Sequence, residues 1–241
     1  MKIQGVTLKG VRVVDVNSPV TDNLVLYYNP ADSTSYSGSG TTINSLTIPN
    51  LTGTMSNITY TSPYFAYNGT SSQISVTDTA ALEPGSGDWT MEAWVYLGTN
   101  TGSKVVLGKF DPGGLAADVS YSMRINGANA YAQMGDGSGA YVDCTGYTLP
   151  LNTWKHIVYV WKNVATNSLE TYVNGVSIGS VSHTLPSILN TSSNLYIGSY
   201  NNGEYSQWMN GRIGVVRLYN AALSASEVLQ NYNADRGTYG L

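Results

Sequence analysis

The strongest constraint on the fold is a long succession of short β-type runs separated by clusters of Gly, Asn, Ser and Asp. Side chains in residues 89–97 alternate between an apolar set and a mixed set, which is the period of a β-strand. Residues 154–161 alternate as well and carry bulk on both faces, which predicts an inner strand covered on both sides. Asn174-Gly175 is the dipeptide that two-residue hairpin turns prefer. The succession predicts a protein built mainly of short antiparallel strands.

A single helix is predicted near the end of the chain. Ser224 followed by Glu227 forms a capping box, and Leu223 with Val228 fits a hydrophobic staple. We expect about two turns, ending near Tyr232. The fold class is therefore all-β, a two-sheet antiparallel jelly-roll sandwich with one short C-terminal helix. The length of 241 residues suits one domain over 21–241, preceded by an N-terminal arm or anchoring segment over 1–20.

Charge and composition exclude several classes of protein. Eleven Lys and Arg against fifteen Asp and Glu, all dispersed, provide no basic stripe for nucleic acid. No apolar run has the length of a membrane span, and the N-terminus lacks the apolar core of a signal peptide. We therefore expect a protein made in the cytoplasm and not exported by a signal peptide. Cys144 is the only cysteine, so no internal disulfide forms, and we expect this thiol to be inert.

Four segments occur in an order and spacing that resemble the laminin G-like domains of the concanavalin A-like lectin/glucanase superfamily. They are residues 88–95, 154–158, 172–175, and 195–198 together with 210–220. The resemblance covers about residues 24–233 and implies the lectin-like sandwich described above. His156 lies where the family commonly places a histidine, and we interpret it as a sheet residue.

A narrower resemblance is carried by residues 24–31 and 35–42, and by 222–227 with the ending 231–241. These segments are similar to laminin G-like structural proteins of tailed-bacteriophage virions. The resemblance implies a non-enzymatic protein of the virion surface, as a capsid decoration or a minor capsid component. Its partners would be other virion proteins, such as a major capsid protein. Val11, Arg12 and Val13 alternate like an edge strand, and we expect them to dock against such a partner.

The carboxylates do not support catalysis. Glucanases of this superfamily use a Glu-x-Asp-x-Glu strand, whose first and last acids share one face. Here Glu92 has only Thr90 and Trp94 as neighbours on its face, so we interpret it as a structural glutamate held by hydrogen bonds. His183 is a lone histidine in a predicted loop. No catalytic residue is assigned, and the protein is predicted not to be an enzyme.

Calcium, which laminin G-like domains often bind at a rim, has few ligands here. The places where the family tends to carry acids read Tyr67-Asn68-Gly69, Ser71-Ser72 and Ile213-Gly214. Because carboxylates set calcium affinity, we expect no metal and no cofactor. The carboxylates that could still contribute to a calcium site are Asp78, Asp88 and Asp111.

Glycan binding is the alternative function. Sugars are held by aromatic faces and by amides and hydroxyls, and these residue types gather in residues 200–208. The candidate ligand-binding residues are Tyr200, Asn202, Tyr205 and Trp208. A second candidate rim is residues 136–141. The protein would then be an adhesin of a tail or head fibre that attaches to a cell-surface glycan, and the same loop could instead be structural or contact surface.

Overall fold

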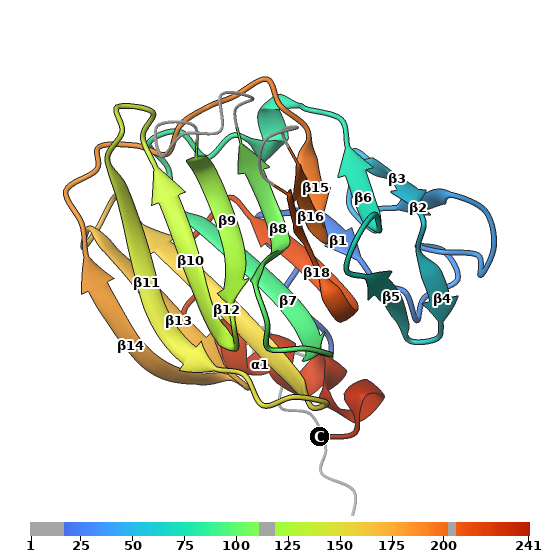
Figure 1. Cartoon of the computed structure of the whole chain (residues 1–241). Coiled ribbons are helices and arrows are strands. Elements are labelled where there is room, and N and C mark those ends of the chain that lie inside the picture. The colour runs from blue at the N-terminus through green and yellow to red at the C-terminus, as the bar shows by residue number, and fades with distance from the viewer. Residues whose placement is uncertain (1–16, 111–118, 202–205) are drawn as a thin grey trace, which may run out of the picture.

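The structure is a computed structural model that describes residues 17–110, 119–201 and 206–241. Two antiparallel eight-stranded sheets lie face to face (Figure 1). Sheet A runs in the order β14 (Val176–Ser182), β13 (Ser168–Val173), β12 (Trp154–Lys162), β7 (Trp89–Leu97), β18 (Asn210–Tyr219), β5 (Tyr64–Asn68) and β4 (Thr59–Thr61), and β1 (Leu24–Tyr28) also pairs with β18. The all-β sandwich predicted from the strand pattern is confirmed.

Sheet B runs in the order β11 (Tyr141–Thr148), β10 (Asn129–Gly135), β9 (Val119–Asn126), β8 (Ser103–Phe110), β15 (Leu195–Ile197), β6 (Gln73–Val76), β3 (Thr52–Ser56) and β2 (Thr42–Asn44). A small hairpin of β16 (Ser199–Asn201) and β17 (Ser206–Trp208) contacts β8. A short 3-10 turn, η1, covers Ala80–Leu82. No helix among the described residues is long and apolar enough to cross a membrane.

The main core fills the space between the two sheets. Sheet A contributes alternate residues of its two central strands, including Met91 and Val95 of β7 and Tyr159 of β12. Sheet B contributes alternate residues of β9 and β10, including Met123 and Ala132. These side chains are fully buried. Alternate side chains of β7 and β12 therefore point into the core between the sheets, as their period-2 pattern predicts. The remaining side chains of each strand point away from sheet B.

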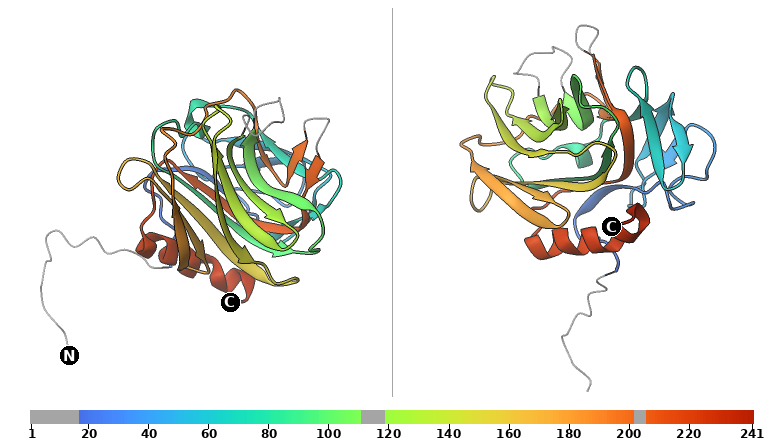
Figure 2. Two further views of the ribbon diagram at one scale, coloured as in Figure 1. Left: turned by 60° about the vertical axis from the view of Figure 1, so that its left-hand side comes forward. Right: turned by 60° about the horizontal axis from the view of Figure 1, so that its bottom comes forward.

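Helix α1 (Ala225–Asp235) covers that other face of sheet A (Figures 1 and 2). Val228 of the helix packs with Leu223 and with Val158 and Val160 of β12, which explains why β12 carries apolar bulk on both faces. Both halves of the Ser224–Glu227 capping box are present. The start of the helix is thus confirmed.

The predicted end of the helix near Tyr232 is wrong. The helix continues to Asp235 and is followed by a 3-10 turn, η3 (Arg236–Tyr239), which ends at Gly240 with φ +75°. The reason is tertiary packing, because the rings of Tyr232 and Tyr239 both stack on Trp94 of sheet A. These contacts hold the last turns against the sheet.

The chain enters the sandwich beside this helix. The backbone N–H of Val20 donates to Asn231 Oδ1 at 2.7 Å, and Gln230 Nε2 donates to the carbonyl of Ser18 at 2.8 Å. Val20 is buried with the helix residues. Residues 18–20 are thus bound to the sandwich. Val11, Arg12 and Val13, the predicted docking residues, lie outside the described residues.

Candidate functional site

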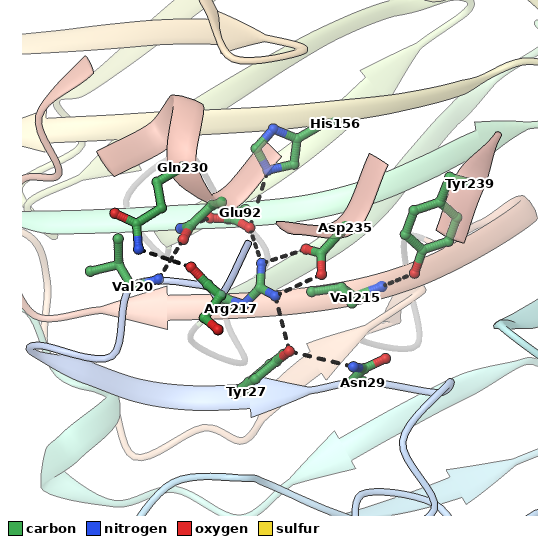
Figure 3. Close-up of polar contacts among 12 residues, drawn as sticks. Val20, Tyr27, Asn29, Glu92, His156, Val215, Arg217, Gln230, Asp235 and Tyr239 are labelled. Carbon is green, nitrogen blue, oxygen red and sulfur yellow. Dashed lines mark hydrogen bonds and ion pairs between the residues drawn. The ribbon is translucent and has the colours of Figure 1, made fainter. Parts of the chain in front are cut away.

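The two outer faces of the sandwich differ, and this difference locates the candidate site. The outer face of sheet A lies beneath α1 and holds a cluster of buried charges (Figure 3). Arg217 of β18 donates from Nη1 to Glu92 Oε1 at 2.5 Å and to Asp235 Oδ2 at 2.8 Å. His156 Nε2 lies 3.1 Å from the same Glu92 oxygen. Asn231 Nδ2 donates to Glu92 Oε2 at 2.6 Å.

Glu92 is therefore structural, as the sequence predicted, although it is not isolated. Its side chain is fully buried, so nothing in solution reaches it. Burial alone raises the pKa of Glu92, but Arg217 and His156 outweigh burial and lower it to about 2. The carboxylate stays charged and ties β7 to β18, β12 and α1.

The other residues considered from the sequence also have structural partners. The ring of His183 stacks on Trp161 with a centroid separation of 3.6 Å. Cys144 is buried, and burial raises the pKa of its thiol, as expected for an inert cysteine. Asp88 accepts backbone N–H bonds from Asn163 and Val164, and Asp78 pairs with Lys109. Asp111, the third carboxylate considered for calcium, lies outside the described residues.

The turn where the family often carries an acid is organised by an amide. Asn68 Oδ1 accepts the backbone N–H groups of Thr70, Ser71 and Ser72. Within the described ranges, no group of three or more His, Cys, Asp or Glu side chains is placed to hold a metal ion.

The outer face of sheet B carries a polar and aromatic surface instead. In β9 and β10 the residues that alternate with the core residues are Ser122, Arg124, Tyr131 and Gln133. The register pairs Arg124 with Tyr131, and it pairs Gln133 with both Ser122 and Asp143 of β11. Cross-strand neighbours lie on one face, so these residues form a continuous patch. We call these five residues, together with Phe110 and Tyr200, the sheet B patch.

The β16–β17 hairpin forms one wall of the patch. Tyr200 is 8% exposed, and its ring lies 4.2 Å from that of Phe110, centroid to centroid. The guanidinium of Arg124 lies over both rings, 5.0 Å from the Phe110 centroid and 6.0 Å from that of Tyr200. A Cβ added to Gly108 would lie 2.5 Å from the Phe110 ring, so glycine lets this ring lie flat on the sheet.

Several polar atoms in and beside the patch are buried without a hydrogen-bond partner within the described part of the chain. They are Ser122 Oγ, Arg124 Nε and Gln207 Oε1, where Gln207 is the cross-strand partner of Tyr200. Buried polar atoms normally have partners, and these three lie around the Phe110–Tyr200 ring pair. Burial raises the pKa of Asp143, while a hydrogen bond from Gln133 and the charge of Arg124 lower it.

Residues of the β16–β17 hairpin beside this surface were predicted from the sequence, but none of the β9, β10 and β11 residues in the patch was. Tyr200 and Trp208 do lie on the hairpin, where Trp208 pairs with Ser199 and is partly exposed. Asn202 and Tyr205 lie outside the described residues. Arg124, Gln133 and Asp143 were missed because they become neighbours only through strand register. The alternation in residues 119–135 was the available signal, since a lone arginine there faces away from the core.

Comparison with known proteins supports the same architecture. The binding domain of paraclostridial mosquitocidal protein 1 superposes with a TM-score of 0.69 at 17% identity, covering 88% of this chain and 52% of that one. The binding domain of botulinum neurotoxin DC in complex with SialylT has a TM-score of 0.66 at 11% identity, covering 91% of this chain and 52% of the other. The same domain in complex with rat synaptotagmin II gives 0.68 at 11%, covering 88% and 52%.

At these identities the likeness concerns the fold alone, and this chain spans about half the length of those structures. No curated protein sequence matches the chain. Residues 68–229, more than half of the chain, match the Concanavalin A-like lectin/glucanases superfamily. This match agrees with the sandwich and with the resemblance in the sequence. The chain therefore belongs to the Concanavalin A-like lectin/glucanases superfamily.

Proposed function

We propose that this protein is a non-catalytic adhesin that holds a cell-surface glycan on the sheet B patch. The observation that carries the proposal is the placement of Arg124. Its guanidinium lies on two aromatic rings, and its Nε is buried without a partner among the described residues. A cation fixed in this way is ready to donate hydrogen bonds to a ligand.

The neighbouring groups suit a sugar. Tyr131 and Tyr141 are partly or largely exposed aromatic residues on β10 and β11, and aromatic rings can pack on the C–H faces of pyranose rings. Asp143 is exposed and can accept hydrogen bonds from sugar hydroxyls, and Gln133 beside it is 8% exposed. The binding domain solved with SialylT shares this fold, which supports the proposal by analogy of fold.

The absence of catalysis is part of the proposal. Glu92 and Asp235 are held beneath α1 by Arg217, and Asp78 and Glu83 are held by Lys109. A glycosidase needs two carboxyl groups that flank the scissile bond of a bound sugar. These four carboxylates are committed to ion pairs inside the fold.

A glycan array probed with multivalent protein tests the proposal, because clustering turns weak single contacts into measurable binding. Arg124→Ala should weaken binding about tenfold or more, the value of a lost hydrogen bond to a charged group. Trp208→Ala tests whether Trp208, a candidate from the sequence analysis, also contributes to glycan binding. Arg212→Ala is the matched control, because Arg212 also lies on two tyrosine rings but belongs to sheet A. An array without a hit, or equal losses in both arginine variants, would contradict the proposal.

We further propose that the sandwich is displayed on a virion surface. The phage resemblance in the sequence motivates this, and the position of the chain entry favours it. Residues 18–20 contact α1 on the outer face of sheet A, opposite the sheet B patch. Attachment through the N-terminal segment would therefore leave the patch facing outward. Antibody labelling of intact particles tests the placement, and particles that lack the protein would refute display without affecting the glycan proposal.

A further inference from the structure

Lys109 of β8 is buried between two carboxyl groups. Its side chain is 0% exposed, and its Nζ lies 2.5 Å from Asp78 Oδ1. Nζ also contacts Glu83 Oε1 and the carbonyl oxygen of Thr191. Asp78 follows β6, and Glu83 follows η1, so three separate segments converge on one amine. The carboxyl groups of Asp78 and Glu83 lie within hydrogen-bonding reach of each other.

No other charged group in the described chain shares this arrangement. Lys104 donates only to the carbonyls of Thr101 and Gly102. Lys162 pairs with one carboxylate, Glu170, and their side chains are 24% and 21% exposed. Arg217 also faces two carboxylates, but a guanidinium does not lose its proton and cannot act as a nucleophile. Among the lysines that the structure describes, Lys109 alone combines burial with contacts to two carboxyl groups.

We propose that Lys109 and Glu83 condense spontaneously into an amide, an isopeptide cross-link, with Asp78 as the group that transfers the protons. Lys109 first passes a proton to Glu83, which gives a neutral amine and a carboxylic acid. The lone pair of Nζ attacks Cδ of Glu83, and Asp78 takes a proton from the nitrogen. The C–OH bond then breaks as Asp78 returns the proton to the leaving oxygen. The products are one amide and one water, and Asp78 ends as the carboxylate with which it began.

The surroundings of Glu83 favour this carboxyl as the electrophile. The backbone N–H of Thr191 donates to Glu83 Oε2 at 3.2 Å, on the oxygen that would carry negative charge in the tetrahedral intermediate. Burial raises the pKa of Glu83, against the lowering effect of Lys109, and so favours the protonated acid that the attack requires. The Asp78 side chain is 30% exposed, which gives the released water a way out.

Proximity lowers the barrier that free amines and acids face in water. Groups held in contact inside a fold react with a very high effective concentration. Every group needed for the reaction is contributed by the chain itself. The cross-link would tie η1 to the end of β8, at the same end of β8 where Phe110 begins the sheet B patch.

The mass of the intact, denatured protein tests the proposal, because an ion pair disappears on unfolding and an amide does not. The wild-type chain should be lighter by one water than its sequence requires. Lys109→Arg keeps the positive charge but cannot form the amide, so its mass should equal its sequence mass. Asp78→Asn removes the proton acceptor and should leave the mass unshifted or shift it only slowly.

Peptide mapping then locates the bond. A branched peptide that joins the Glu83 segment to Lys109 should appear in wild type and vanish in Lys109→Arg. A folded wild-type protein with its full sequence mass would overturn the proposal, and so would a branch at Asp78. Circular dichroism of each variant shows whether it is folded, and the wild-type mass decides the question even where a variant does not fold.

Discussion

Arg217 is the residue on which the buried charges beneath helix α1 depend. It pairs with Glu92 and Asp235, and all three side chains are nearly or fully buried. Arg217→Met would leave two carboxylates without their cation, and breaking a buried pair in this way costs about 3–5 kcal/mol. Urea unfolding should show that loss. Arg236→Met is the matched control at an exposed position and should change stability by less than about 0.5 kcal/mol.

Glu92 should also make the free energy of unfolding depend on pH in the acid range. Its pKa is lowered from 4.5 to about 2 in the folded chain, so its charge stabilises the fold above about pH 4.5. That stabilisation, about 3 kcal/mol, should be lost as the pH falls from 4.5 through about 2. Glu92→Gln should be less stable at neutral pH and should lose less stability over the same acid range. If the free energy of unfolding in urea changed equally with pH in the wild type and in Glu92→Gln, this prediction would be contradicted.

Single residues also show how far the sequence could be interpreted. Glu92 was correctly predicted to be structural, because its own face of β7 offers no second acid. Its partner Arg217 lies 125 residues away, and no local pattern links the two. The same limit applies to Arg124 and Asp143, whose neighbourhood arises from the pairing of three strands. Periodicity predicts on which face a side chain lies, but not what lies beside it.

At the scale of elements, the start of α1 is set by a local signal. Ser224 Oγ accepts the N–H of Glu227, and Glu227 Oε2 accepts the N–H of Ser224. Ser224→Ala should therefore cost about 1 kcal/mol in urea unfolding. Ser226→Ala, two residues on and also exposed, removes only a hydroxyl contact to Ser224 Oγ at 3.0 Å and should cost only a few tenths of a kcal/mol. Equal costs would mean that the capping box does not stabilise this helix.

The end of the same helix could not be predicted in this way. The local sequence suggests a stop near Tyr232, but the structure continues through η3 because of contacts with sheet A. The backbone N–H of Val215 donates to the Tyr239 hydroxyl at 2.8 Å, and the Tyr239 ring stacks on Trp94 at 4.4 Å. A helix start that depends on neighbours three residues apart can be predicted from sequence. An end held by a distant strand cannot.

At the scale of the whole molecule, the sandwich was predictable because its strands alternate in sequence and its turns are marked, as at Asn174-Gly175 with φ values of +51° and +78°. The position of the candidate site could not be predicted from the sequence, because it depends on which outer face the helix covers. With α1 on sheet A, the outer face of sheet B carries the sheet B patch, in which Arg124 and Tyr131 are partly exposed and Asp143 is exposed. The two outer faces therefore differ, since the chain entry and α1 lie on sheet A and the proposed glycan site lies on sheet B.

The boundary between arm and sandwich follows from the same division and can be tested by truncation. Tyr219 donates its hydroxyl hydrogen to the carbonyl of Val20 at 3.1 Å, and Val20 is 8% exposed beneath the helix. Deleting residues 2–16 should leave the free energy of unfolding within about 0.5 kcal/mol of the full chain. Deleting residues 2–22 should cost about 2–3 kcal/mol, because it removes a buried valine and its hydrogen bonds.

The two truncations also separate anchoring from folding. If the N-terminal segment docks on a virion protein, the protein lacking residues 2–16 should fold, keep its glycan binding and no longer join particles. Incorporation of that truncated protein at normal occupancy would refute the docking role of Val11, Arg12 and Val13. A loss of stability on deleting residues 2–16 would instead show that the fold needs more of the segment than residues 18–20. Denaturant unfolding and particle incorporation, measured on the same two proteins, therefore separate the two roles.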